Sequence, residues 1–178
     1  MLRKLTGFLI AAVLAVSACG SASESGKPAE PARSEVPQPG VDARDEKGQT
    51  ALMRAVATPD SRDTVERLLN EGAGVDVQSE SGVTALMIAA GVGPADTVKL
   101  LIDRGADVNR RTPGNYTALM AAALNGQTEI VKLLLDSGAD PTIKDAGGKT
   151  ASDWAASKSH ADIVELLNER RAPGTGRK

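Results

Sequence analysis

Apolar residues recur along the chain with the spacing of one face of a helix. Val65, Leu68 and Leu69 stand at positions i, i+3 and i+4, and the same spacing returns from Val98 and from Val131. Each run ends three residues before a glycine, and a shorter, alanine-rich apolar stretch precedes it. The pattern predicts pairs of helices in which an apolar first helix is followed by an amphipathic second helix.

The helix pairs repeat at a nearly fixed distance. The sequence Thr-Ala-Leu-Met begins at Thr50, Thr84 and Thr117, and a fourth threonine at Thr150 gives spacings of 34, 33 and 33 residues. One such unit cannot bury its apolar face alone, so a period of this length predicts stacked units. We therefore expect an all-α solenoid of about four helix-turn-helix units.

Threonine and glycine have conformational roles in this pattern. Each threonine stands where a first helix begins, and we expect its hydroxyl to cap free backbone N–H groups. A left-handed residue is expected after each second helix and in the turn just before each threonine. These positions are Gly72, Gly105, Gly138, Gly48, Gly82, Asn115 and Gly148. Asparagine at one of them fits, because it tolerates positive φ better than most residues.

The unit resembles the ankyrin repeat, whose pattern is Asp-x-x-Gly-x-Thr-Pro-Leu-His-x-Ala and then a second helix ending Leu-Leu-x-x-Gly-Ala-Asp. Here DEKGQTALMRAV, SESGVTALMIAA and TPGNYTALMAAA match the first half, and TVKLLIDRGADV matches the second. The resemblance implies an ankyrin-repeat solenoid over residues 41–171, with short β-hairpin loops between its helix pairs. Its repeats are expected at about 45–77, 79–109, 112–142 and 145–171.

The chain departs from the family at the histidine of the first helix. Met53, Met87 and Met120 stand in its place. A row of thioethers suits a soft copper ion, but one methionine per unit at a core-facing position favours packing. We expect these side chains to replace a polar contact between repeats by an apolar one.

The first forty residues differ from the rest in composition. Arg3 and Lys4 precede an apolar run at residues 5–16, and small residues follow, as in a secretory signal. Residues 16–19, Val-Ser-Ala-Cys, resemble the lipobox of bacterial lipoproteins, in which the cysteine receives a diacylglycerol and becomes the mature N-terminus. We expect residues 1–18 to be a signal peptide and Cys19 to carry lipid; a plain secreted protein is the alternative.

The segments that flank the repeats are poor in core-forming residues. Residues 19–40 hold four prolines and no leucine, isoleucine or aromatic residue, which predicts a Pro/Ser-rich linker. Residues 172–178 are predicted to be a disordered basic tail. The lipoprotein resemblance implies an envelope location. This is the outer membrane, facing the periplasm, in a Gram-negative host and the outer face of the cell membrane in a Gram-positive one.

Few residues are available for catalysis. The single cysteine and single histidine exclude an internal disulfide and a zinc site of the usual kind. His160 matches a structural histidine that precedes the second helix in ankyrin repeats. A net charge of -2 gives no bulk attraction for nucleic acid. We expect no enzyme activity, catalytic residue, metal, cofactor or small-molecule substrate.

The resemblance implies that a concave surface of hairpin tips and first helices binds another protein. Tyr116 and Trp154 both fall on variable, outward positions, and interface hot spots are rich in Trp, Tyr and Arg. We hypothesise that Tyr116, Trp154 and Ile88, flanked by Arg110 and Arg111, centre the binding surface. In the alternative, Trp154 caps the core of the last repeat and Tyr116 has no role.

Together these features predict a monomeric, membrane-anchored interaction module of the bacterial cell envelope. Two narrower roles stay open. One is an immunity protein that occludes a toxin, and the other is a protective or assembly factor for a periplasmic enzyme.

Overall fold

The computed structural model describes residues 40–58 and 62–171, which contain eight α-helices and no strand. No helix in these residues is both long and apolar enough to cross a membrane. The predicted signal peptide, Cys19, nearly all of the linker and the basic tail lie outside them. The helices are α1 Ala51–Ala55, α2 Arg62–Asn70, α3 Ala85–Val92, α4 Ala95–Asp103, α5 Ala118–Leu124, α6 Thr128–Asp136, α7 Ala151–Ser157 and α8 Ala161–Arg171.

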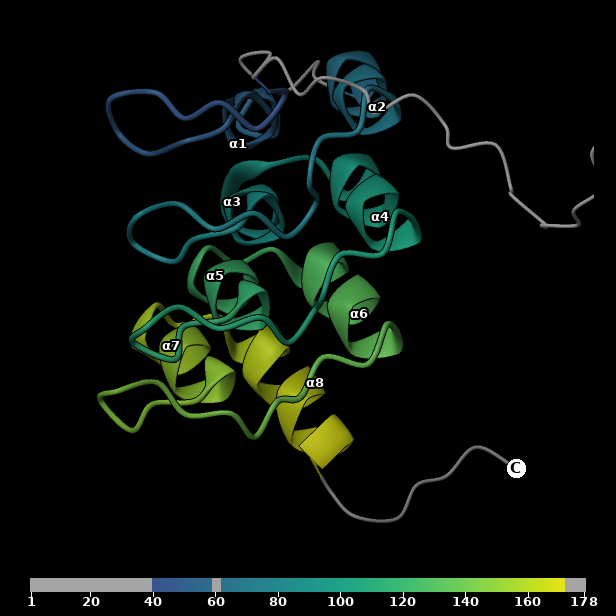
Figure 1. Cartoon of the computed structure of the whole chain (residues 1–178). Helices are drawn as coiled ribbons and strands as arrows, with labels where there is room; N and C mark the ends of the chain where they lie inside the picture. The colour runs from purple at the N-terminus through teal and green to yellow at the C-terminus, as the bar shows by residue number, and fades with distance from the viewer. Residues whose placement is uncertain (1–39, 59–61, 172–178) are drawn as a thin grey trace, which may run out of the picture. The chain divides into compact units, whose positions relative to one another are not determined.

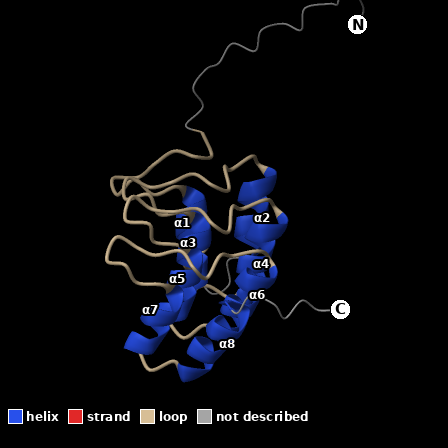
Figure 2. Ribbon diagram, turned by 90° about the horizontal axis from the view of Figure 1, so that it is seen from below, coloured by secondary structure: helices blue, strands red, loops and turns tan. Residues whose placement is uncertain are grey.

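The helices form two layers, as the repeated pattern predicts. Helices α1, α3, α5 and α7 stack in order in the first layer, and α2, α4, α6 and α8 stack beside them in the second (Figures 1 and 2). The hairpin loops project from the first layer on the side away from the second. We call the surface of these loops and of the first-layer helices the inner face, and the surface of the second layer the outer face.

Each first-layer helix begins at a buried threonine. The hydroxyls of Thr50, Thr84 and Thr117 each accept a hydrogen bond from the backbone N–H three residues on, at 3.3 Å. Thr150 makes the same contact at 3.4 Å with Asp153, whose carboxylate accepts from the Thr150 N–H at 2.8 Å. The predicted caps are confirmed, and the last helix adds the reciprocal bond of a capping box.

All seven positions expected to be left-handed have positive φ, between 58° and 94°. In the second hairpin turn, the N–H of Gly82 donates to the carbonyl of Ser79, and the N–H of Ser79 donates to the carbonyl of Val83, both at 2.9 Å. Asn115, with φ 58°, closes the third turn through an N–H···O bond to Thr112 at 2.8 Å. The turns therefore form without strand pairing in the described residues.

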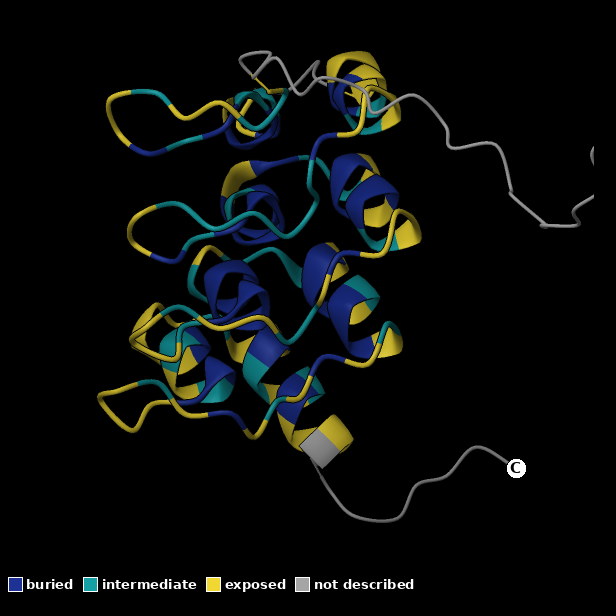
Figure 3. Ribbon diagram, in the orientation of Figure 1, coloured by how far each residue is buried: buried dark blue, intermediate teal, exposed yellow. Residues whose placement is uncertain are grey.

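The core is aliphatic and lies where the two layers face each other (Figure 3). Leu86 and Leu119 are each 1% exposed. The methionines that replace the family's histidine are equally buried, at 1%, 4% and 1% for Met53, Met87 and Met120. Their predicted packing role is confirmed. Burial of one such side chain stabilises the fold by about 1.5–3 kcal/mol.

Hydrogen bonds at the base of the units join successive connecting segments. A side-chain oxygen that precedes each of the first three helix pairs accepts from a backbone N–H that follows that pair. The contacts are Asp42 with Gly74 at 2.9 Å, Asp76 with Asp107 at 3.0 Å and Asn109 with Asp140 at 2.8 Å. Each of these three helix pairs is thereby closed at its base by a polar contact as well as by its apolar face.

The hydroxyl of Thr97 is buried and has no hydrogen-bond partner among the described residues. The equivalent residues in the next units are Ile130 and Ile163, both buried and apolar. A buried hydroxyl without a partner costs free energy. Thr97→Val should therefore raise the free energy of unfolding by about 1 kcal/mol, measured by urea denaturation.

Thr64→Val is the matched control, because Thr64 holds the equivalent position in α2 but is exposed. It should leave the free energy of unfolding nearly unchanged. A loss of stability in Thr97→Val would show that the hydroxyl has a favourable contact in the folded protein.

Candidate functional site

Equivalent positions of successive units align on the inner face. The residue before each helix-capping threonine forms one column, and the fourth residue of each first-layer helix forms a second. The first column is Gln49, Val83, Tyr116 and Lys149, and the second is Arg54, Ile88, Ala121 and Trp154. Since the backbone repeats from unit to unit, differences of shape and charge on this face come from its side chains, and those in these two columns differ in every unit.

The third and fourth units meet in a cluster around Trp154. The rings of Tyr116 and Trp154 pack edge to face, with centroids 6.1 Å apart and an interplanar angle of 83°. The indole Nε1–H donates to Asp145 Oδ2 at 2.9 Å, and Lys149 Nζ lies 4.7 Å from the Trp154 ring centroid. We call these four residues the aromatic cluster. Its contacts hold the indole in one orientation on the inner face.

Trp154 is half-buried and packs against the aliphatic core. Its ring contacts Tyr116 of the preceding unit, so Tyr116 has a structural partner and is not isolated. Trp154 thus covers part of the core and also presents an edge to solvent. The sequence did not reveal this contact, because the two residues belong to different units and their side-chain directions follow from the stacking.

The hydrogen bonds of Asp145 set the ionisation of the cluster. The backbone N–H of Lys149 holds the pKa of this carboxyl below its usual range, and Trp154 Nε1–H and the N–H of Gly147 act in the same direction. Burial raises the pKa of the Tyr116 hydroxyl, and the negative charge of Asp145 raises it further. At neutral pH, Asp145 is therefore ionised, and Tyr116 keeps a neutral hydroxyl that can donate a hydrogen bond.

The other predicted contact residues lie on other parts of the inner face. Ile88 is half-buried and stands two units away in the Trp154 column, with the small Ala121 between them. Arg110 and Arg111 are exposed on the hairpin that leads to Tyr116. The carbonyl of Arg111 accepts from the Gln78 side chain at 3.0 Å, which ties this hairpin to the one before it.

Val92 is a residue of this face that sequence reasoning missed. Its side chain is 63% exposed, and among the described residues it is the one large hydrophobic residue that is classed as exposed. It stands four residues after Ile88, on the same side of α3. This i, i+4 spacing was visible in the sequence and extends the apolar part of the inner face across the second unit.

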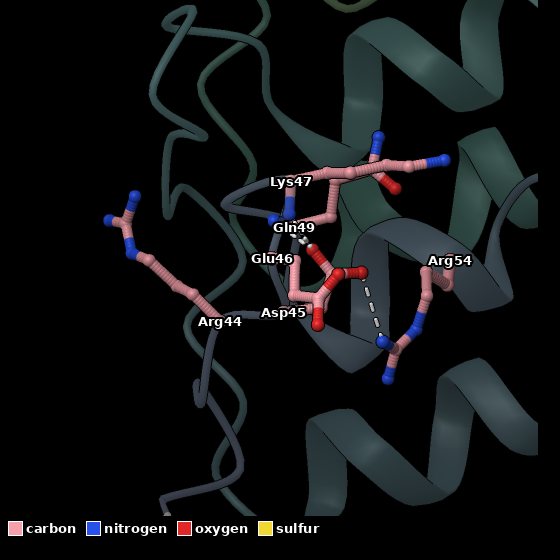
Figure 4. A pocket seen from close by; sticks show the side chains of 6 residues that line it. All are labelled: Arg44, Asp45, Glu46, Lys47, Gln49 and Arg54. Atoms are coloured by element: carbon pink, nitrogen blue, oxygen red, sulfur yellow. Dashed lines mark hydrogen bonds and ion pairs between the residues drawn. The ribbon is translucent and has the colours of Figure 1, made fainter.

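A polar pocket lies at the first hairpin (Figure 4). Asp45 and Arg54 are an ion pair at 3.0 Å, and their positions are equivalent to those of Asp145 and Trp154. The backbone N–H groups of Gln49 and Lys47, together with the Arg54 guanidinium, hold the pKa of Asp45 below its usual range. The residues that line the pocket are Arg44, Asp45, Glu46, Lys47, Gln49 and Arg54.

His160 occupies a structural position at the start of α8. Its N–H donates to the Ala155 carbonyl at 3.0 Å, and its own carbonyl accepts from the Val164 N–H at 3.1 Å. Its ring lies so close to Gly126 that a β-carbon there would come within 2.6 Å of His160 Cε1. In the described residues, no group of three or more His, Cys, Asp and Glu side chains could hold a metal.

The chain has a single tyrosine, so its titration can be followed directly. Asp145→Asn removes a negative charge and should lower the pKa of Tyr116, measured by the absorbance of the tyrosinate. In the wild type, the folded-state pKa is above the unfolded value. The unfolded chain therefore ionises first, and the free energy of unfolding falls as pH rises through this range.

Asp96→Asn makes the same charge change on α4 in the second layer and serves as the control. This control should leave the pKa of Tyr116 unchanged. A Tyr116 pKa that is the same in Asp145→Asn as in the wild type would contradict the electrostatic coupling within the aromatic cluster.

Comparison with known proteins agrees with the repeated helix pairs of the structure. The family model "Ankyrin repeats (3 copies)" matches residues 22–112, 52–145 and 111–174. No curated protein matches the chain in a sequence comparison. Ankyrin repeats are protein–protein interaction modules and are typically non-enzymatic. The family match covers most of the sequence and agrees with the stacked helix pairs, so the chain belongs to the ankyrin repeat family.

Proposed function

We propose that this ankyrin repeat protein is a non-enzymatic module that binds one protein partner through its inner face. The contact surface is centred on Tyr116, Trp154 and Ile88. One observation carries the proposal. The two aromatic residues of the described segments meet on this face, half-exposed, while the core is built from aliphatic side chains. The aromatic residues thus pack against the edge of an aliphatic core and leave part of each ring on the surface.

The cluster is suited to binding because it is already ordered. Asp145 holds the indole nitrogen, and Lys149 and Tyr116 contact the ring. Because the Trp154 rotamer is already fixed, a partner can pack on it with little further loss of side-chain entropy, a loss that otherwise weakens association. Tryptophan and tyrosine side chains in such positions commonly carry most of an interface's binding energy.

The arginines beside the cluster support a role at the rim of the interface. Arg110 and Arg111 are exposed, on the hairpin that ends at Tyr116. Rim charges act mainly on the rate of association and on the choice of partner. We propose that the central apolar contacts supply most of the affinity and that these two arginines discriminate between partners.

We further propose that the protein is exported and anchored in the cell envelope by lipid on Cys19. The sequence Val-Ser-Ala-Cys after an apolar run supports this proposal. The narrower roles, as immunity protein or as protective factor for a periplasmic enzyme, would both use an inner face displayed at the membrane.

The contact surface is tested by the double substitution Tyr116→Ala and Trp154→Ala. The full chain serves as bait for proteins from the envelope of the organism that produces it, and the affinity of the captured partner is then measured by titration. We expect the double variant to bind about a hundredfold more weakly, because truncation of a hot-spot residue costs about 2 kcal/mol or more.

The outer-face control is Lys99→Ala with Lys132→Ala, on α4 and α6. It should keep full affinity. If the double aromatic variant bound as tightly as the wild type, or if the control lost as much, the proposed surface would be wrong.

The anchor is tested by Cys19→Ser, which removes the only thiol of the chain. The variant should lose incorporation of an alkyne-tagged fatty acid and move from the membrane pellet to the soluble fraction after lysis. Retention in the pellet together with unchanged labelling would exclude lipid on Cys19. Arg67→Ser, on an exposed position of α2, should behave as the wild type.

A further inference from the structure

Charge is divided between the two faces of the repeat domain. The hairpin loops and first-layer helices, residues 43–58, 77–92, 110–125 and 143–158, hold eight basic and five acidic residues. The four second-layer helices hold six basic and nine acidic residues. The inner face is therefore positive on a chain whose formal net charge is -2.

Most of the acidic residues on the inner face already have partners within it. Asp45 pairs with Arg54, and Asp145 accepts from Trp154 Nε1. Asp153 completes the capping box at the start of α7. These contacts fix the orientation of the three carboxylates, and the ion pair with Arg54 offsets the charge of Asp45. The eight basic residues of the face still outnumber its five acidic ones.

The basic side chains of the inner face are mostly unpaired. The exposed ones that form no ion pair within 4.0 Å with a carboxylate that the structure describes are Arg44, Lys47, Arg110, Arg111, Lys144, Lys149 and Lys158. On the outer face, Arg67 pairs with Glu71, Arg104 with Glu66 and Arg170 with Asp136. The other exposed basic residues there, Arg62, Lys99 and Lys132, form no such pair with a described carboxylate.

These unpaired charges surround an apolar centre. Ile88 and Val92 form it in the second unit, and Tyr116 and Trp154 continue it in the third and fourth. Arg110 and Arg111 stand on the hairpin beside Tyr116, and Lys158 follows Trp154 by one helical turn. A complementary surface therefore needs apolar side chains in the middle and carboxylates around them.

We propose that the partner binds as an acidic protein segment in which leucine or aromatic side chains are flanked by aspartate and glutamate. This inference rests on the proposed function and adds the chemistry of the partner. A nucleic acid is disfavoured, because Ile88 and Val92 would face phosphate and sugar, and Glu46 and Glu80 would repel the backbone.

A random peptide library displayed on phage tests the inference without knowledge of the natural partner. The bait is the full chain in a nonionic detergent. Peptides enriched by the wild type should combine Leu, Phe or Trp with flanking Asp or Glu. Synthetic copies that lack tryptophan can be titrated against the fluorescence of Trp154, the only tryptophan of the chain. Their affinity should fall as ionic strength rises.

Two charge-reversed variants supply the comparison. Arg110→Glu with Arg111→Glu should bind the acidic peptides at least tenfold more weakly and, in a fresh selection, should enrich peptides rich in Lys and Arg. Lys99→Glu with Lys132→Glu changes the net charge equally on the outer face. It should bind the acidic peptides as the wild type does.

The outcomes separate this inference from the proposed function. Enriched peptides without an acidic excess, or acidic peptides that bind the arginine variant as tightly as the wild type, would overturn the charge preference. If binding of such peptides were still lost with Tyr116→Ala and Trp154→Ala, the inner-face contact itself would stand. If the selection enriched no peptide beyond the level of a control selection with detergent and no bait, both the charge preference and the proposed function would be overturned.

Discussion

Burial of the leucine and the methionine in the Thr-Ala-Leu-Met sequence of the first three units is the interaction on which the rest of the structure depends. Leu86 and Met87 on α3 are 1% and 4% exposed because α3 is packed between neighbouring units. A single helix pair would leave these side chains in water. The first and last pairs have only one neighbour, and the last carries Ser152 and Asp153 where the others carry Leu and Met. The stack thus determines which positions must be apolar and which are free to vary.

The functional surface follows from this constraint. Stacking fixes the backbone of every first-layer helix, and in the first and fourth units a hairpin residue contacts the helix residue nine positions later. The first unit uses this geometry for an ion pair between Asp45 and Arg54, and the fourth uses it to hold Trp154 on Asp145. The same frame therefore presents a charged side chain at one end of the inner face and an aromatic one at the other.

Local and periodic features could be predicted from the sequence. The threonine caps and the left-handed positions depend on single residues in a repeated pattern, and the buried methionines depend on the helical period. Contacts between units could not be predicted in the same way. The edge-to-face contact of Tyr116 with Trp154 and the position of Lys149 over the indole require side-chain directions that only the stacked structure supplies. The burial of Thr97 could be predicted only by alignment with the next two units, which have isoleucine at the equivalent position.

The hydrogen bonds at the base have a consequence for how such a protein can change its length. Asp42, Asp76 and Asn109 each bond only to the next connecting segment. A duplicated unit would bring its own acceptor and its own backbone donor, and every existing bond would find an equivalent partner. Duplication or deletion of a whole unit can therefore add or remove recognition positions, while the hydrogen bond between neighbouring units is kept.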